Sequence, residues 1–309
     1  MMRWVLVLSA CGALALLAAC RREAPAPAAG PDAAFVQQEQ AWRDARLQRL
    51  LAPDGWASLV GLHWIDPGVH TVGSGPGNGI RLAMGPAHLG VLRVSAAGVR
   101  LEPAGDVALT LDGAPFASPQ DLRTDAADAG PSVVGFDDGK GMATVIERAG
   151  RLALRVRHAD APTRTGFAGL EYWPADPSWR VQARFVPHPP GKTIPIANII
   201  GGVEDMPNPG ALEFERGGRT YRIEAIDEGG DTLFLVFADR TNGHGSYGAG
   251  RFVDVPKPDA QGRVTVDFNQ AYNPPCAFTP FATCPLPPPE NRLDLAVDAG
   301  EKAYRKPHA

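Results

Sequence analysis

The feature that most constrains the fold is the pattern of apolar and polar residues after residue 54. Short apolar runs that alternate with polar residues, such as "GVLRVSAAGVRLEP" at 90–103 and "RTYRIEAID" at 219–227, are repeatedly broken by turn-forming residues. The 35 glycines and 30 prolines serve such turns. Alternation with a period of two is typical of strands with one buried face. We therefore predict a mostly β body.

A single stretch before this body has the spacing of a helix. "FVQQEQAWRDARLQRLLA" runs from residue 35, and Pro53-Asp54-Gly55 ends it. Its apolar side chains recur at roughly helical intervals: Phe35, Ala41 or Trp42, Ala45, Leu47, and Leu50 or Leu51. The sequence therefore predicts one helix over 35–54.

The first twenty residues have the pattern of a lipoprotein signal. Arg3 supplies a positive start, Trp4 to Leu17 an apolar run, and Leu17-Ala18-Ala19-Cys20 a small-residue cleavage site. An ordinary cleaved signal peptide is the alternative. We expect removal of 1–19, acylation of Cys20, including palmitate, and anchoring through several acyl chains. Arg21 rather than Asp follows the anchor, which favours the periplasmic face of the outer membrane. The Ala/Pro-rich segment 20–34 is expected to be a disordered tether.

Charge and cysteine content narrow the function classes. Without residues 1–19 the chain has 29 basic and 34 acidic residues, scattered rather than clustered, so no nucleic-acid partner is expected. Of the four cysteines, Cys11 leaves with the signal peptide and Cys20 takes the lipid. Cys276 and Cys284 remain as an even pair in an oxidising compartment, and we expect them to form a structural disulfide.

The β body is expected to have two packed antiparallel units. "GLEYWPADPSWR" at 169–180 carries aromatic residues and prolines between two sets of predicted strands. We place the first unit at 55–168 and the second at 169–309, the latter with a disulfide-braced, Pro-rich C-terminal segment.

The first unit resembles the forkhead-associated β-sandwich. Residues 70–116 contain a glycine turn, an "N-x-I-x-L" strand from Asn78, a Pro-x-His turn ending at His88, and an Asp-Gly hairpin. The resemblance implies a sandwich and phosphothreonine binding. Three departures argue against that ligand: Ser74 replaces an arginine, Gly85 a serine and Val107 an asparagine. We therefore predict the sandwich fold but not phosphothreonine binding.

A second resemblance covers most of the chain. The stretches "GWASLVGLHWIDPGVHTVGS" at 55–74, "FADRTNGHGSYGAGRFVDV" at 237–255 and "VDFNQAYNPPCAFTPFATCPLPPPENRLDLAVDAGEKAY" at 266–304 look together like the bacterial exported-protein family called domain of unknown function 1684. This resemblance implies no activity, because the family is defined by sequence alone.

Candidate ligand-binding residues gather in the second unit. One group follows the apolar run "TLFLVF" and another lies around the cysteine pair, where loops on a β scaffold commonly carry function. The same residues serve a hairpin or a buried ion-pair network equally well. The candidates are Asp239, Arg240, Asn242, His244, Tyr247, Arg251, Asp267, Tyr272, Asn273, Asn291 and Arg292.

Neither a hydrolase nor a metal site has a strong signature. Asp239, His244 and Ser246 have the side chains of a triad, but no G-x-S-x-G elbow is present. The seven histidines show no H-x-H or H-E-x-x-H spacing, so we expect no metal and no cofactor. Our leading hypothesis is a non-catalytic lipoprotein that binds a small molecule, a glycan or a protein. The alternatives are a periplasmic hydrolase and a structural envelope protein.

Overall fold

The computed structural model describes residue 1 and residues 32–306. The predicted signal sequence, Cys20 and most of the predicted tether lie outside the described residues. Every helix and strand described lies in one compact unit after residue 30. Within the described residues, no helix is long and apolar enough to cross a membrane.

Strands make up most of the regular structure of the described residues, and short single turns lie between some of them. The helices are α1 Ala33–Leu50 and α2 Pro162–Thr165. The strands are β1 Leu59–Ile65, β2 Gly68–Gly73, β3 Ile80–Arg81, β4 Gly90–Ser95, β5 Gly98–Pro103, β6 Leu109–Leu111, β7 Ala114–Phe116, β8 Gln120–Leu122, β9 Val134–Phe136, β10 Gly141–Arg148, β11 Arg151–His158, β12 Arg180–Pro187, β13 Thr193–Ala197, β14 Val203–Pro207, β15 Gly210–Arg216, β16 Arg219–Ala225, β17 Thr232–Phe237, β18 Arg251–Pro256 and β19 Arg263–Asp267.

The strands before residue 160 form two sheets around one apolar core. A six-stranded sheet has the order β1-β11-β10-β9-β6-β7, and a five-stranded sheet has the order β3-β2-β4-β5-β8. In β4, Gly90, Leu92 and Val94 are buried and alternate with more exposed residues, as the sequence pattern predicts. The strands pair antiparallel except for the short parallel contact of β2 with β3, and an isolated parallel bridge joins Thr124 to Val145; the all-antiparallel prediction contained neither.

The predicted Asp-Gly hairpin joins β6 to β7. Asp112 and Gly113 both have positive φ, 51° and 84°. Two consecutive residues with positive φ form the two-residue hairpin turn whose twist matches that of the paired strands. Asp-Gly is a preferred sequence for this turn.

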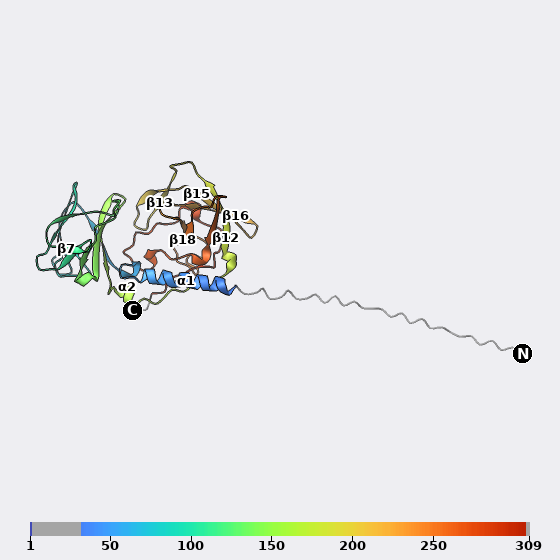
Figure 1. Ribbon diagram of the computed structural model, residues 1–309, viewed down its shortest axis with the longest axis horizontal. Helices are drawn as coiled ribbons and strands as arrows, with labels where there is room; N and C mark the ends of the chain where they lie inside the picture. Colours follow the sequence, from blue (N-terminus) through green and yellow to red (C-terminus); the bar gives the residue numbers. More distant parts are fainter. Residues whose placement is uncertain (2–31, 307–309) are drawn as a thin grey trace. The chain divides into compact units, whose positions relative to one another are not determined.

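The strands after residue 179 form a second set of sheets. A four-stranded sheet has the order β16-β15-β12-β19, and β13 pairs with β14 and β17 with β18 in two hairpins. In Figure 1, β12, β15, β16 and β18 of this second set lie above α1, and β7 of the first set lies at the left. The prediction of a mostly β chain with one N-terminal helix is confirmed.

The β17–β18 hairpin has two buried faces, which explains the uninterrupted apolar run of β17. Leu233, Leu235 and Phe237 pack into the core of the four-stranded sheet. Phe234 and Val236 point the other way and pack with Phe252 of β18 in a separate cluster. Because side chains alternate along a strand, a run without polar interruptions indicates cover on both sides.

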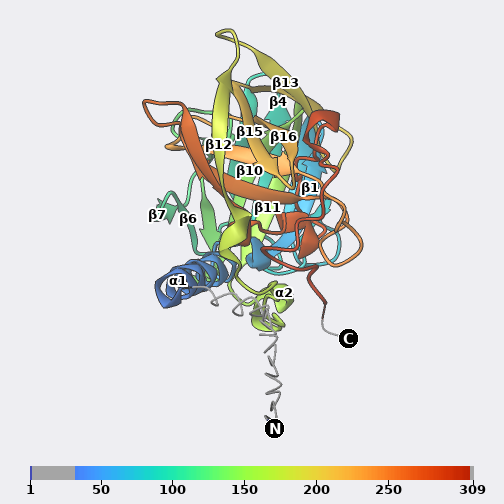
Figure 2. The same cartoon turned by 90° about the vertical axis from the view of Figure 1, so that its right-hand side faces the viewer.

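The buried face of α1 differs from the predicted one. Phe35 and Leu50 are buried as expected, but Glu39 and Arg46 are buried with them, while Leu47 is only partly covered. Glu39 accepts a hydrogen bond from Arg180 at 2.7 Å, and Arg46 donates to Glu301 at 2.9 Å. The two charges can face inward because distant carboxylate and guanidinium groups pair with them. Figure 2 shows α1 and α2 at the same end of this unit.

The alternating run "LDLAVDAG" at 293–300 predicts a last strand, but the described residues after Arg292 form none. Within the described residues, the chain beyond Asp267 forms isolated bridges and single turns, including the pairing of Ala238 with Arg292. Backbone bonds to residues 238–240 hold the start of this segment, as from Leu293 N–H to the Ala238 carbonyl oxygen, and Arg251 holds its end by donating to the carbonyl oxygens of Val297 and Ala299.

Candidate functional site

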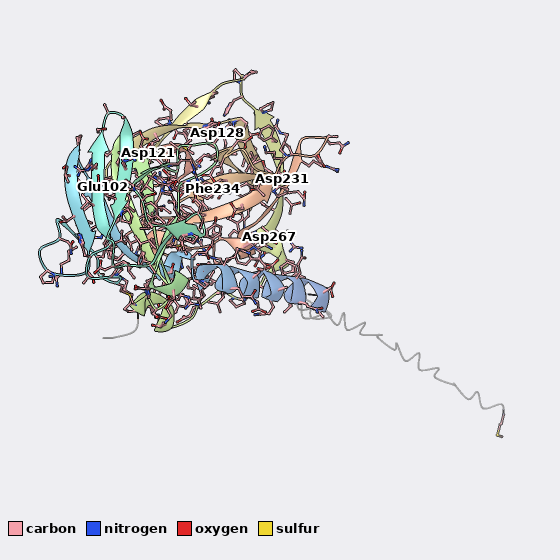
Figure 3. All side chains as sticks on the ribbon, turned by 60° about the vertical axis from the view of Figure 1, so that its left-hand side comes forward. Glu102, Asp121, Asp128, Asp231, Phe234 and Asp267 are labelled. Atoms are coloured by element: carbon pink, nitrogen blue, oxygen red, sulfur yellow. The ribbon has the colours of Figure 1, made fainter. Side chains whose placement is uncertain are left out.

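A large cavity lies between the six-stranded sheet and the second set of strands. It has a volume of about 500 Å³, and we call it the interface cavity. Its apolar wall consists of Trp56, Ile196, Met206, Ile226, Phe234 and Phe252. Figure 3 labels Phe234 of β17 near the middle of the unit.

The second set of strands supplies most of this wall. The outward face of the β17–β18 hairpin contributes Phe234 and Phe252, and the β13–β14 hairpin contributes Ile196 and Met206. The segment that holds the cysteine pair closes another side with Thr283, Cys284 and Pro285. The apolar clusters on both sides of the β17–β18 hairpin keep the wall in place.

The opposite wall is basic. On β11, Leu154 and Val156 face the core of the sandwich, so Arg155 and Arg157 point to the outer face of the six-stranded sheet. Arg155 lines the cavity and is only 6% exposed. Trp56 lies beside both arginines, with its ring centre 5.4 Å from Cζ of Arg155 and 5.6 Å from that of Arg157.

Acidic groups gather at a different part of the cavity. Asp254 of β18 accepts a hydrogen bond at 2.9 Å from the hydroxyl of Tyr272. Glu228, in the loop after β16, also lines the cavity, and partial burial together with Asp254 raises its pKa. Burial raises the pKa of Tyr272, and the carboxylate of Asp254 adds to this effect. The cavity is therefore apolar along its length and carries opposite charges on different elements.

A smaller cavity of about 430 Å³ adjoins the first one beneath α1. The two share Arg46, Trp56, Asp254 and Tyr272. Arg46 is fixed by Glu301 and by the carbonyl oxygen of Asn273 at 3.1 Å, and its guanidinium lies 4.7 Å from the ring centre of Tyr272. Arg46 is therefore held in place by contacts within the protein, although it lines both cavities.

Asp239 and Arg251, two of the predicted site residues, form a fully buried ion pair. Nη2 of Arg251 donates to Asp239 at 2.7 Å, and neither side chain is exposed. Asp239 also accepts from the backbone of Thr241 at 2.7 Å. Burial lowers the pKa of Arg251, and the Asp239 carboxylate opposes this change. The pair binds the C-terminal segment to the β17–β18 hairpin rather than facing a cavity together.

The glycine-rich turn after β17 is held by its own side chains. Asn242 accepts from the backbone of Asp239 at 2.6 Å and donates to Ser246 Oγ at 3.0 Å. His244 is exposed, and its Nδ1 lies 3.1 Å from the carbonyl oxygen of Asn242. Ser246 is buried against Thr241 at 2.8 Å. Asp239, His244 and Ser246 are therefore not linked as a catalytic relay.

Four other predicted residues are also committed to structural contacts. Asp267 accepts from Arg180 at 2.5 Å next to α1, where Figure 3 labels it. Asn273 donates to the Lys302 carbonyl oxygen at 2.7 Å. Asn291 is fully buried and bonds the backbone of Glu224 in both directions. Tyr247 donates to the Cys276 carbonyl oxygen at 3.3 Å.

The two predicted segments do enclose a third cavity, of about 400 Å³. Asp239, Arg240 and Asn242 line one side and Leu286 and Arg292 the other. Arg240 is exposed and pairs with Asp294, its Nε lying 2.6 Å from the carboxylate. Of the predicted site residues, only Tyr272 lines the larger interface cavity.

Cys276 and Cys284 lie side by side as free thiols, so the structure does not contain the predicted bridge. The backbone N–H of Cys276 is 3.1 Å from Cys284 Sγ. The Cys284 thiol also donates to the other sulfur, which lowers the pKa of Cys276 and raises that of Cys284. Their neighbouring positions are compatible with the disulfide, which stays a prediction.

Sequence reasoning missed the residues that make up the interface cavity. "RLALRVRH" at 151–158 already places Arg155 and Arg157 on one face of a strand. A basic face is ordinarily exposed to solvent, so the pattern alone did not indicate a site. Phe234 belongs to the apolar run "TLFLVF", which indicates burial but not a site.

The described residues contain no group of three or more His, Cys, Asp or Glu side chains that could hold a metal ion. They define a mostly β protein with a partly open, mostly apolar cavity between two sets of sheets. Residues 165–302 match the family described as "Protein of unknown function (DUF1684)", and the chain belongs to this family. No curated protein matches the chain.

A solved structure is also similar to this chain. It is the solution NMR structure of an uncharacterized protein of Haloarcula marismortui, with 32% sequence identity over 45% of this chain and 78% of that chain, and a TM-score of 0.38. The family region supplies most of the apolar wall and the acidic groups of the interface cavity. Trp56, Arg148 and Arg155 come from the part of the chain before residue 165.

Proposed function

We propose that this protein is an exported lipoprotein that binds a small molecule in the interface cavity and does not transform it. Acyl chains on Cys20 would hold it at the periplasmic face of the outer membrane, as the signal pattern at residues 1–20 indicates. The observation that carries the binding function is the cavity itself. Its volume of about 500 Å³ falls within the range of about 300 to 1,000 Å³ of small-molecule sites.

The lining supports an apolar ligand body. Aromatic and aliphatic side chains cover most of the wall, and each Å² of apolar surface that a ligand buries contributes about 25 cal/mol. The predicted loop residues bond to one another or to the backbone, which leaves fewer of their polar atoms available to a ligand.

We further propose that the first unit is a forkhead-associated-like sandwich that serves as a scaffold. Sheets of six and five strands around one core support the resemblance. Its glycine turn is tied internally, because Ser74 donates to the Gly85 carbonyl oxygen at 2.7 Å and Asn78 contacts His88 at 3.1 Å. Its contribution to function is the basic wall formed by β11.

A binding experiment tests the cavity proposal. The full-length chain carrying Cys20→Ala, which removes the proposed lipidation site, is titrated with Nile red, a neutral dye that fluoresces in apolar surroundings. We expect saturable binding at one site. Met206→Trp places an indole ring in the cavity and should weaken binding by about 10-fold or more, since a ligand atom and a side chain cannot share the space.

Val69→Trp is the control, because it adds the same ring at a residue that is 60% exposed and lies outside the cavity. Equal dye binding by the wild-type and Met206→Trp chains would refute the assignment of the site. Turnover in an esterase, phosphatase and glycosidase panel that is lost in His244→Ala would instead support the hydrolase alternative.

A further inference from the structure

The basic wall of the interface cavity contains more positive than negative charge. Arg148 and Arg157 both lie close enough to Arg155 to lower its pKa. Asp125 is already paired with Arg148 at 2.7 Å. Asp54 acts on Arg157 only at longer range.

Among the described residues, Arg155 and Arg157 both have a buried Nε without a hydrogen-bond partner, and of these two only Arg155 lines the cavity. Among residues 32–306 Arg155 makes no ion pair within 4.0 Å, and its Nε has no hydrogen-bond partner. Its one hydrogen bond runs from Nη2 to Thr283 Oγ1 at 3.3 Å. Burial, together with Arg148 and Arg157, lowers the pKa of Arg155 to about 10, so the group stays protonated at neutral pH.

A buried guanidinium without an acidic partner is unfavourable unless something else neutralises it. The planar guanidinium has five N–H donors arranged to match a carboxylate. Trp56 lies beside the same guanidinium, and Arg155 is only 6% exposed, so an ion pair formed there is less screened by solvent than one on the surface.

We propose that the ligand is an apolar carboxylic acid, bound with its carboxylate on Arg155 and its body along Ile226, Phe234 and Phe252. This inference rests on the proposed binding function and names the ligand class. The other charged groups of the cavity favour a single negative charge. Glu204, Glu228 and Asp254 line it as well and would repel a second anionic group.

The test compares two ligands that differ only in the head group. Decanoate and decanol are titrated as competitors of Nile red into the full-length Cys20→Ala chain. Decanoate should bind about 10- to 100-fold more tightly, the ratio expected for one charge-assisted interaction in a dry site. Arg155→Met should remove this preference and leave decanol binding unchanged.

Arg151→Met is the matched control. Arg151 lies on the same strand and the same face, but it is exposed and stacks on Trp64 outside the cavity. Its replacement should leave the ratio of the two affinities unchanged. Without ligand, Arg155→Met should melt at the same or a higher temperature than the parent chain, because an apolar side chain replaces an unpaired buried charge.

The outcomes separate the two proposals. Failure of both ligands and of Nile red to bind would overturn the proposed function. Equal affinities of decanoate and decanol for the parent chain would overturn the carboxylate assignment and leave the binding function standing, even if Arg155→Met did not fold. A preference for decanoate that survives in Arg155→Met would also overturn the assignment.

Discussion

The buried pair of Arg251 and Asp239 gives a sharp test of how the C-terminal segment is held. Arg251 has no exposed surface and donates to Asp239 at 2.7 Å, to Val297 O at 2.8 Å and to Ala299 O at 2.5 Å. Arg251→Ala removes all of these donors at once. It leaves a carboxylate and two carbonyl oxygens in a dry site.

The expected loss of stability is large. Removal of one partner from a buried ion pair costs about 3 to 5 kcal/mol, and an unsatisfied buried acceptor costs about 1 to 3 kcal/mol. These contributions overlap, so we expect the free energy of unfolding to fall by at least about 4 kcal/mol. Arg251→Lys keeps the charge but has fewer donors, and it should lose about 1 to 3 kcal/mol.

Arg240→Ala provides the matched control. Arg240 precedes the same turn and also pairs with an aspartate, Asp294, but both partners are more than half exposed. An exposed pair contributes about 0 to 1 kcal/mol. Urea denaturation followed by circular dichroism and by tryptophan fluorescence measures the three variants, and agreement of the two signals checks that unfolding is two-state. Equal losses for Arg251→Ala and Arg240→Ala would refute the view that the buried pair anchors the C-terminal segment.

The remaining predictions concern the anchor, the cysteine pair and pH. Cys20→Ala should move the protein from the membrane fraction to the soluble fraction, and unchanged fractionation would contradict lipidation. The protein isolated from an oxidising compartment should show no free thiol at Cys276 or Cys284, and Cys276→Ser should lose about 2 to 3 kcal/mol of stability in urea; a full thiol count before denaturation would argue against the bridge. Burial tends to raise the pKa of Glu224, but hydrogen bonds from His188, Arg222 and Asn208 outweigh it and lower this pKa below its usual 4.5. The resulting stability should be present above about pH 4.5 and disappear as pH falls through the lower folded-state pKa, so Glu224→Gln should flatten the acid limb of a stability–pH curve, and an unchanged limb would contradict this assignment.

Local patterns predicted much of the β architecture. The alternation in 90–103 indicated strands with one covered face, and Asp112-Gly113 indicated a hairpin. Both signals act over a few residues, because strand geometry and turn conformations depend on neighbours along the chain. The same reasoning failed for the segment after Arg292, where a few backbone bonds to residues 238–240 and side-chain bonds from Arg251 take the place of a regular strand pairing.

The candidate loops could be found from the sequence. The sequence did not show what the polar groups of these loops bind. Asp239, Asn242 and Arg251 have the chemistry of a binding site, and the hypothesis of a structural network was equally open. The structure shows that they bond one another or the backbone. Hydrogen-bond partners that lie far apart in sequence leave no periodic signal, so composition does not reveal whether such a group is free.

By itself, the sequence determined that this chain is mostly β, that one helix precedes the sheets, and that Arg155 shares a strand face with Arg157. The tertiary structure alone decided that this face is covered. Thr283, 128 residues away, and Trp56 close over Arg155 and turn a basic face that would ordinarily be solvated into the wall of a cavity. Alternation along a strand specifies which side chains lie together, whereas their burial depends on which distant element packs over them.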